Sequence, residues 1–263
     1  MKVAVEDFPP AAVVAGRTLI GASILIPIAI YRKKFGGAVL GFKYVAFYAL
    51  MEMIGPWILI TTAEQKINSG LAGLLVSTVP IFATIITSFR GDHSVWQLKR
   101  VFGIVVGFIG LILVVGIESL SGNSDPLSIA MVIVASMGYA YAVIMVTSNL
   151  PLVDGIAING LAMAITTVFW APVAIAQWPS SISMSSALSL IALGVFSTAI
   201  AFLLFFKVMA EIGPARSSLV TYLNTAIAVL LGVIILREPL TVGIIVGLPM
   251  VLVGSYLASK KTA

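Results

Sequence analysis

Glu52 places a carboxylate in an apolar part of the chain, eight residues after the start of the predicted membrane-crossing stretch 44–63. A charged side chain near the centre of a bilayer costs on the order of 2.5–3.5 kcal/mol on insertion scales. A partner, a water-filled cavity or protonation of the acid would offset this cost. A substrate-binding or proton-coupling site is therefore one interpretation of Glu52, and a structural hydrogen bond inside a helix bundle is the alternative.

Arg17 is the second charged side chain within an apolar stretch, residues 11–30. At 1.5 Å per residue it lies about 9 Å from one membrane surface, and Glu52 lies about 17 Å from the same surface. The difference of about 8 Å is within reach of an extended arginine side chain. An ion pair between Arg17 and Glu52 is therefore one expectation, and the alternative is that Arg17 extends outward to water alone.

Pro80 interrupts the stretch 71–89, and a proline leaves a backbone carbonyl without its helical hydrogen bond. In the stretch 216–236, Thr225 stands at the matching position, beside Asn224. These two stretches could form a polar ring at the centre of a cavity. The alternative is a packing kink with an interhelical hydrogen bond worth about 0.6 kcal/mol. Further candidates for the ring are Ser77, Thr78 and Tyr222.

Ser136 and Tyr139 are three residues apart in the stretch 127–147, so they share one helix face. Tyr139 could stack on a substrate, although such tyrosines more often pack between helices with a satisfied hydroxyl. Ser197 occupies the position in the second half that matches Glu52. Since only one half carries the charge, symmetry does not demand an acid at this place.

The chain contains few residues of the types that carry out catalysis. There is no Cys, which excludes disulfides, thiolate metal sites and thiol redox chemistry, and the single His, His93, lies in a predicted loop. Membrane hydrolases and transferases need a cluster such as paired acids or a Ser–His couple. No such cluster and no nucleotide-binding loop are present. We therefore predict no enzyme activity, no cofactor, no metal site and no use of ATP.

The composition indicates the elements that hold these residues. Hydrophobic residues make up 60% of the chain and charged residues 10%, against roughly 25% charged in a soluble domain. The apolar residues form blocks of about twenty, the length that crosses a bilayer as a helix. We predict an all-α, polytopic membrane bundle. Its nine transmembrane helices are expected at 11–30, 44–63, 71–89, 101–117, 127–147, 156–177, 187–209, 216–236 and 242–258.

The sequence contains an internal repeat. At a constant shift, Pro27 to Ile30 aligns with Pro172 to Ile175, and Leu59 aligns with Leu204. Other pairs at this shift of 145 are Ile67 with Ile212, Leu74 with Leu219 and Ala83 with Ala228. At a shift of 144, Gly103 and Gly110 align with Gly247 and Gly254. The first four stretches therefore match the last four.

The stretch 127–147 has no partner, because its copy would precede Met1. We therefore predict two five-helix repeats with the first helix missing, residues 1–117 and 118–263. An odd number of helices per repeat inverts one repeat relative to the other, as is typical of secondary transporters. We also expect the natural protein to begin upstream of Met1, or another subunit to fill the gap.

The basic residues predict an orientation. Eleven of them fall on one side of the membrane and three on the other, with Arg17 inside a helix. Such an excess marks the cytoplasmic side, so we expect the C-terminus inside and the N-terminus of this chain outside the cytoplasmic membrane. The net charge of +5 is explained by these loops and not by a nucleic-acid patch. The eleven are Arg32, Lys33, Lys34, Lys43, Arg90, Lys99, Arg100, Lys207, Arg216, Lys260 and Lys261.

Glycines recur along two of the predicted helices and permit close helix contact. They are Gly103, Gly107 and Gly110 in one and Gly243, Gly247 and Gly254 in the other. Packing within the chain is the expected use, and a homodimer through the same helices is the alternative.

Four stretches resemble those of a known family: VEDFPP at 5–10, AEQKINSGLAGLLVSTVP at 63–80, EIGPARSSLVTYLNTAIAVLLGVIILREPLT at 211–241 and GLPMVLVGSYL at 247–257. The family they resemble is the EamA-type branch of the drug/metabolite transporter superfamily. The resemblance implies ten helices in two inverted halves, with both termini cytoplasmic. It also implies that the substrates are small metabolites, often amino acids, or drugs. This chain differs from that pattern in lacking the usual first helix.

We expect a secondary transporter that works by alternating access about a central site. Its partners would be a small-molecule substrate, protons as a candidate coupling ion, and the lipid bilayer. A non-transporting structural or regulatory subunit, or a truncated transporter, is the alternative, and a transport assay distinguishes them.

Overall fold

The computed structural model describes residues 3–91, 97–120, 125–212, 227, 229–235, 237 and 241–259. Every regular element in these ranges is a helix, which confirms the predicted all-α class. Six helices in the described ranges are long and apolar enough to cross a membrane: Pro10–Tyr31, Phe42–Ala63, Ser69–Phe89, Pro126–Asn149, Gly155–Ala176 and Met184–Val208. Val242–Ala258 forms a shorter apolar helix. The predicted helix 216–236 lies mostly outside the described residues.

The helices form two units according to their mutual contacts. Unit 1 combines Met1–Gln65 with Met145–Ser218, and unit 2 combines Lys66–Ile144 with Leu219–Ala263. Each unit therefore draws on both halves of the sequence. This division by contact differs from the predicted repeats 1–117 and 118–263, which stay a prediction.

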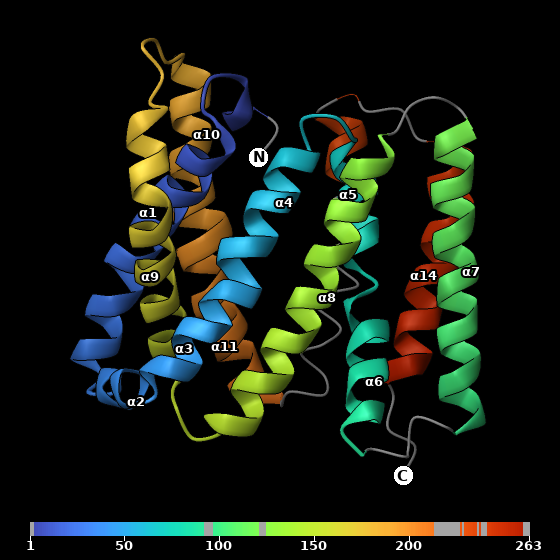
Figure 1. Ribbon diagram of the computed structural model, residues 1–263, viewed down its shortest axis with the longest axis horizontal. Coiled ribbons are helices and arrows are strands. Elements are labelled where there is room, and N and C mark those ends of the chain that lie inside the picture. The colour runs from blue at the N-terminus through green and yellow to red at the C-terminus, as the bar shows by residue number, and fades with distance from the viewer. Residues whose placement is uncertain are drawn as a thin grey trace. The chain divides into compact units, whose positions relative to one another are not determined.

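Unit 1 contains the N-terminal helices and the helices between Gly155 and Ile212 (Figure 1). In chain order these are η1 (Ala4–Glu6), α1 (Pro10–Tyr31), α2 (Phe35–Leu40), α3 (Phe42–Ala49), η2 (Leu50–Ile54), α4 (Gly55–Ala63), α9 (Gly155–Ala176), α10 (Met184–Gly194), η4 (Val195–Ile200) and α11 (Ala201–Ile212). The short helix α2 lies between the predicted helices 11–30 and 44–63, in a segment that was predicted to be a loop.

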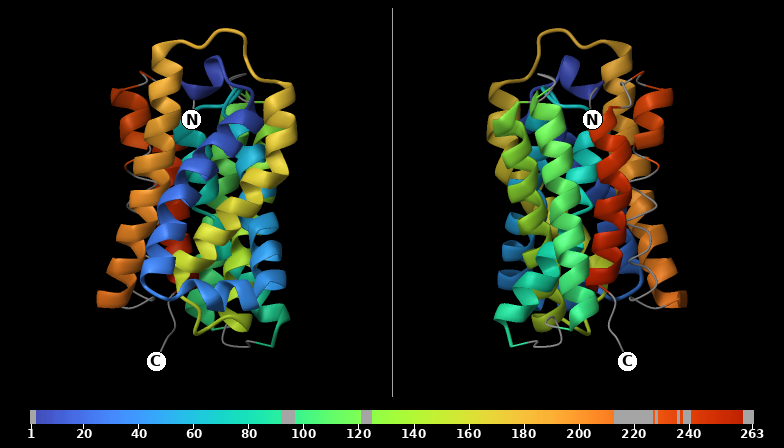
Figure 2. Two further views of the ribbon diagram at one scale, coloured as in Figure 1. Left: turned by 90° about the vertical axis from the view of Figure 1, so that its left-hand side faces the viewer. Right: turned by 90° about the vertical axis from the view of Figure 1, so that its right-hand side faces the viewer.

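α1 and α9 pack side by side and run antiparallel (Figure 2, left). Thr18 and Thr167 share a hydrogen bond of 2.8 Å between their hydroxyls. Farther along α1, Leu25 and Ile26 lie against Gly160. Residue numbers therefore rise along one helix as they fall along the other, which defines the antiparallel direction.

The bounds of these helices follow the sequence repeat. α1 begins at Pro10 and ends at Tyr31, and α9 begins at Gly155 and ends at Ala176, so both ends differ by 145. The packing is also reciprocal, because α3 packs on α9 while α10 packs on α1. Unit 1 is thus built from corresponding helices of the two halves, with α3 of the first half on α9 of the second and α10 of the second half on α1 of the first.

The N-terminal segment of unit 1 folds back onto the start of α10. Asp7 accepts hydrogen bonds from the backbone N–H and the hydroxyl of Ser183, the N-cap residue of α10. These bonds, led by the one from the Ser183 hydroxyl, lower the pKa of Asp7. Phe8 is buried beneath them with its ring edge-on to Trp178, 5.5 Å between centroids. The start of the chain is therefore fixed to the second half of unit 1.

Unit 2 contains α5 (Ser69–Val76), α6 (Val79–Phe89), α7 (Leu98–Leu120) and α14 (Val242–Ser259), with most of α8 (Pro126–Asn149). α7 and α14 lie side by side (Figure 2, right). Gly103 approaches Ala258, and Gly110 approaches Val251, so this pair is antiparallel too. Between these contacts Gly107 meets Gly254. Gly103, Gly107, Gly110 and Gly254 therefore pack helices within the chain, as expected.

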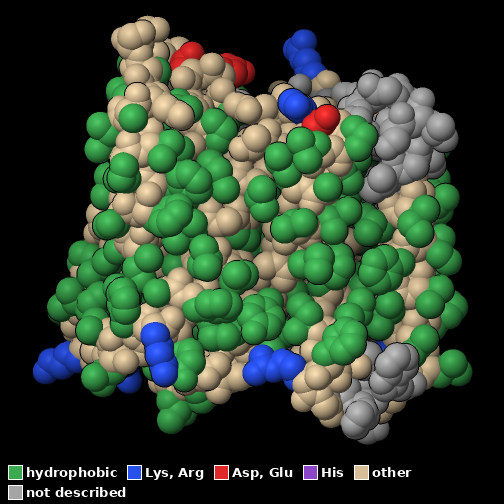
Figure 3. All heavy atoms as spheres, in the orientation of Figure 1, with side chains coloured by type: hydrophobic (Ala, Val, Ile, Leu, Met, Phe, Trp, Pro, Cys, Tyr) green, Lys and Arg blue, Asp and Glu red, His purple; other side chains and the backbone are tan. Residues whose placement is uncertain are grey.

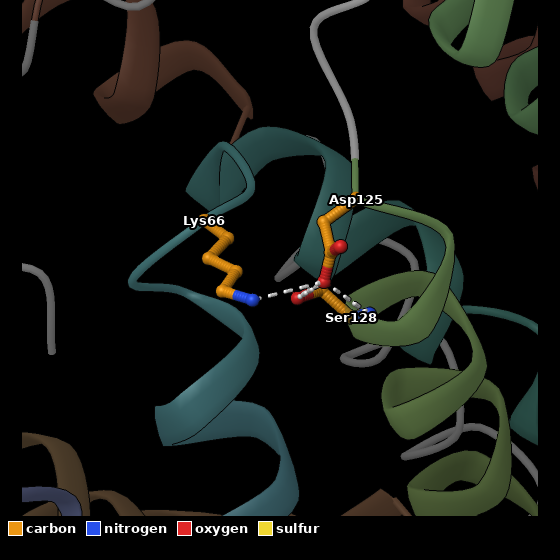
Figure 4. A network of polar contacts seen from close by, with 3 residues as sticks. All are labelled: Lys66, Asp125 and Ser128. Atoms are coloured by element: carbon orange, nitrogen blue, oxygen red, sulfur yellow. Dashed lines mark hydrogen bonds and ion pairs between the residues drawn. The ribbon is translucent and has the colours of Figure 1, made fainter.

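A polar network fixes the start of α8 in unit 2 (Figure 4). Asp125 precedes the helix and accepts hydrogen bonds from the backbone N–H and the hydroxyl of Ser128, at 3.1 and 2.8 Å. Lys66 lies 3.6 Å from the same carboxylate oxygen. The Ser128 hydroxyl is the largest cause that lowers the pKa of Asp125, and Lys66 adds to it. Asp125 therefore caps α8 as a charged acid.

Candidate functional site

Two π-helical segments occupy corresponding places in the two halves of unit 1. η2 joins α3 to α4, and η4 joins α10 to α11. They begin at Leu50 and Val195, again 145 residues apart. A π turn includes one more residue than an α turn, so it displaces side chains, and such segments occur frequently at functional sites. The candidate site is built around these two segments.

Glu52 is the third residue of η2. Its Oε2 atom is buried and accepts no hydrogen bond from the residues that the structure describes. Buried polar atoms in proteins almost always have a partner, so an unsatisfied carboxylate oxygen in an apolar helix needs an explanation. The structure thus places the predicted acid inside unit 1, with one carboxylate oxygen buried and without a hydrogen bond from the described residues.

Arg17 is also buried, with 6% of its surface exposed. Its guanidinium carbon lies 3.8 Å from the ring centroid of Trp57 in α4. Its Nε and Nη2 donate to the hydroxyl of Thr198 in η4, at 3.2 and 3.0 Å. The expectation that Arg17 extends outward alone is wrong, because an aromatic ring and a hydroxyl hold it inside the unit. No hydrogen bond from Arg17 reaches Oε2 of Glu52.

The repeat shift indicated Ser197 as a site residue and did not indicate its neighbour Thr198. The side chain of Ser197 is exposed, whereas Thr198 is buried and also donates to the carbonyl of Leu193 at 2.8 Å. The constant repeat shift identified the segment but not the residue that faces inward. Thr198 is 181 residues from Arg17, so no local spacing could have linked them.

Trp170 and Asn159, both in α9, were also missed. The indole Nε1 of Trp170 donates to the carbonyl of Ile54 in η2 at 3.2 Å. Asn159 is buried and accepts a hydrogen bond of 3.1 Å from the hydroxyl of Tyr48, in α3. Each π segment is therefore held by a polar side chain from the other half, Trp170 on η2 and Arg17 on η4.

The predicted residues of unit 2 gather at a helix break. The stretch 69–89 is divided at Ser77 and Thr78, and Pro80 stands in the first turn of α6, so the predicted interruption is present. Thr78 donates to the carbonyl of Leu75 at 2.6 Å, and Ser136 of α8 donates to the same carbonyl at 3.3 Å.

A serine from α14 completes this break. Ser255 donates to the carbonyl of Ser77 at 2.8 Å, and both residues are buried. Hydroxyls from two neighbouring helices thus satisfy the carbonyls at the interruption. Tyr139 is half-buried one turn after Ser136. Tyr222 and Asn224 lie outside the described residues, so the predicted polar ring remains a prediction.

The chemistry available in unit 1 is that of a buried carboxyl group and a buried guanidinium cation. A carboxylate in apolar surroundings can exchange a proton or bind a cation, and a guanidinium can bind a carboxylate or phosphate. Within the described ranges, no three His, Asp or Glu side chains are grouped so that they could hold a metal ion. The described residues therefore support binding and proton exchange.

Comparison with known proteins adds a family. A model of the EamA-like transporter family matches residues 1–116 and 126–260. YoaV of Bacillus subtilis (strain 168), an uncharacterized transporter, is 27% identical over 266 residues, which cover 98% of this chain and 89% of YoaV. YedA of Escherichia coli (strain K12), an uncharacterized inner membrane transporter, is 26% identical over 272 residues, 99% of this chain and 87% of YedA.

A solved structure shows a similar fold. A protein known from a crystal structure matches with a TM-score of 0.68 over 95% of this chain and 88% of its own, at 17% sequence identity. At this identity the likeness concerns the fold alone.

Proposed function

This chain belongs to the EamA-like transporter family and is a multi-pass membrane transporter, and we propose that it moves small metabolites across the cytoplasmic membrane by alternating access. The repeats would be residues 1–117 and 118–263, inverted relative to each other, and the substrates amino acids, related compounds or drugs. No catalytic reaction is part of the proposal.

The observation that carries the proposal is the unsatisfied Oε2 of Glu52 within η2. A protein that only needed a stable bundle would gain from an apolar residue there, because an unsatisfied buried polar group costs roughly 1–3 kcal/mol. An acid kept in this position suits a site that binds and releases a proton or a cationic group in each transport cycle.

The antiparallel packing of corresponding helices supports the inverted repeat. Two repeats related by an axis in the membrane plane place each helix of one repeat antiparallel to the corresponding helix of the other. α1 with α9 and α7 with α14 both have this relation. Inverted repeats of this kind underlie alternating access in other secondary transporters.

The test is transport by the purified chain in proteoliposomes, with Glu52→Gln compared to wild type between pH 5 and pH 8. Because glutamine cannot release a proton, we expect Glu52→Gln to lose at least tenfold in proton-coupled uptake. The matched control is Glu211→Gln, a change at an exposed glutamate of α11 that should transport like wild type.

Labelled metabolites grouped by class would identify the substrate in the same vesicles. Normal transport by Glu52→Gln across this pH range would remove Glu52 from the mechanism. If the wild-type chain transports no class, it is a structural or regulatory subunit, and the proposal fails as a whole.

A further inference from the structure

Residues 31–44, which we name the basic turn, connect α1 to α3 at one end of unit 1. Their four basic side chains, Arg32, Lys33, Lys34 and Lys43, are all exposed. No acidic residue occurs between positions 31 and 44. In Figure 3, Lys and Arg side chains mark this end of unit 1 in blue. The turn therefore presents a concentrated positive charge that it does not neutralise itself.

The backbone of the basic turn is held in one conformation. The backbone N–H of Lys33 donates to the carbonyl of Ile30 at 2.8 Å, and the backbone N–H of Lys34 donates to the carbonyl of Ala29 at 3.0 Å. This pair of bonds closes α1 by a Schellman motif, in which the residue after the cap is left-handed and usually glycine. Here it is Lys33, with φ of 55°. The chain thus carries a lysine where glycine would be less strained.

α2 is fixed on one side by close packing. A side-chain carbon added at Gly37 would be 3.4 Å from Val153, and one added at Gly41 would be 2.6 Å from Leu150. The turn between α8 and α9 therefore lies directly against α2. Three large apolar side chains of the basic turn are exposed. Tyr31 is 88% exposed, Leu40 92% and Phe42 53%.

We propose that the basic turn binds the headgroups of anionic phospholipids in the leaflet that it faces. Exposed cations attract these lipids, and the exposed Tyr31, Leu40 and Phe42 are suited to enter the boundary between headgroups and acyl chains. A soluble acidic protein would match the charge but would leave these apolar side chains in contact with water. The combination of charge and apolar surface therefore favours lipid.

The geometry of Lys43 fits this assignment. Its Nζ lies 4.8 Å from the ring centroid of the adjacent Tyr44, so the ammonium group sits over an aromatic ring at the edge of the bundle. Aromatic and basic side chains gather in this way where membrane proteins meet the headgroup region. The proposal does not depend on the transported substrate.

The experiment is native mass spectrometry of the full purified chain with equal amounts of phosphatidylglycerol and phosphatidylcholine of identical acyl chains. Wild type should retain the anionic lipid in preference. The triple variant Arg32→Gln, Lys33→Gln, Lys34→Gln should lower the ratio of retained phosphatidylglycerol to phosphatidylcholine by about tenfold, and Lys34→Gln alone by about threefold.

The control removes the same charge elsewhere. Arg90, Lys99 and Lys207 are exposed and lie outside the basic turn, so their triple change to Gln should leave the ratio nearly as in wild type. An equal fall in both triples would show attraction by net charge alone and would overturn the proposal. A ratio unchanged in the first triple, or binding of an acidic soluble protein in place of lipid, would also overturn it. The single variant keeps the test valid if the triple does not fold.

Discussion

Arg17 and Glu52 are both ionisable residues within membrane-crossing helices of unit 1, and they differ in their hydrogen bonds. The guanidinium of Arg17 lies on the ring of Trp57 and donates two hydrogen bonds to Thr198. One oxygen of Glu52 has no such bond from the described residues. A stacked and hydrogen-bonded cation stabilises the packing of α1, α4 and η4, whereas a partly unsatisfied acid is suited to a change of protonation.

Arg17→Lys tests the structural part of this contrast. Lysine keeps the charge but loses the planar donors and the stacking surface, so we expect about 1.5–3 kcal/mol of lost stability. The measurement is thermal unfolding in detergent. Arg90→Lys, at an exposed position, should unfold like wild type.

A double variant isolates the hydrogen bonds from Arg17 to Thr198. If the hydrogen bonds to Thr198 matter, the losses from Arg17→Lys and Thr198→Val should not add, because both remove the same interaction. Additive losses, or an unfolding temperature unchanged by Arg17→Lys, would contradict the stabilising role.

At the scale of elements, the glycine contact between α7 and α14 decides how close these helices lie. A side-chain carbon added at Gly254 would be 2.5 Å from Cα of Gly107 and 2.6 Å from the carbonyl oxygen of Gly103. Both neighbours are backbone atoms, which cannot turn aside as a side chain can. The helices would have to separate to admit even a methyl group.

We therefore expect Gly254→Ala to destabilise the protein by about 1–3 kcal/mol, the usual cost of overpacking. Thermal unfolding and the yield of monodisperse protein measure the effect. The control is Gly36→Ala, since an added carbon at Gly36 meets nothing within 4 Å. Equal stability of Gly254→Ala and wild type would mean that the two helices are not held at this distance.

The sequence predicted those elements that the repeat shift or a proline position indicates. The repeat shift anticipated the matching bounds of α1 and α9, and Pro80 marked the break between α5 and α6. α2 was missed because a six-residue helix containing two glycines has too short a pattern to register. The π segments were missed since one extra residue in a turn hardly alters an apolar run.

At the scale of the whole molecule, the contact units could not be predicted. The antiparallel pairing of α1 with α9 joins residues more than a hundred positions apart, and no local pattern records it. The candidate site shares this limit. Glu52 and Arg17 were identified by their charge in apolar stretches, but Thr198, Trp57 and Asn159 are ordinary residues whose roles arise only from tertiary contacts.

Orientation in the membrane is a prediction at this scale. With eleven basic residues on one side, we expect a cysteine at Gly36 to be cytoplasmic and one at Ser180, between α9 and α10, to be outside. Impermeant thiol reagents applied to intact cells measure this directly, because the wild-type chain has no Cys. Labelling at Gly36→Cys with protection at Ser180→Cys would reverse the orientation.

The two π segments also leave the spacing between the halves unchanged. The shift between the halves is 145 before the segments, at Pro27 and Pro172, and still 145 after them, at Leu59 and Leu204. If one half alone had gained the extra residue of a π turn, the shift would change by one across the segment. The two halves therefore keep the same length through η2 and η4, and the distortions at Glu52 and Thr198 are matched in place and do not offset one half against the other.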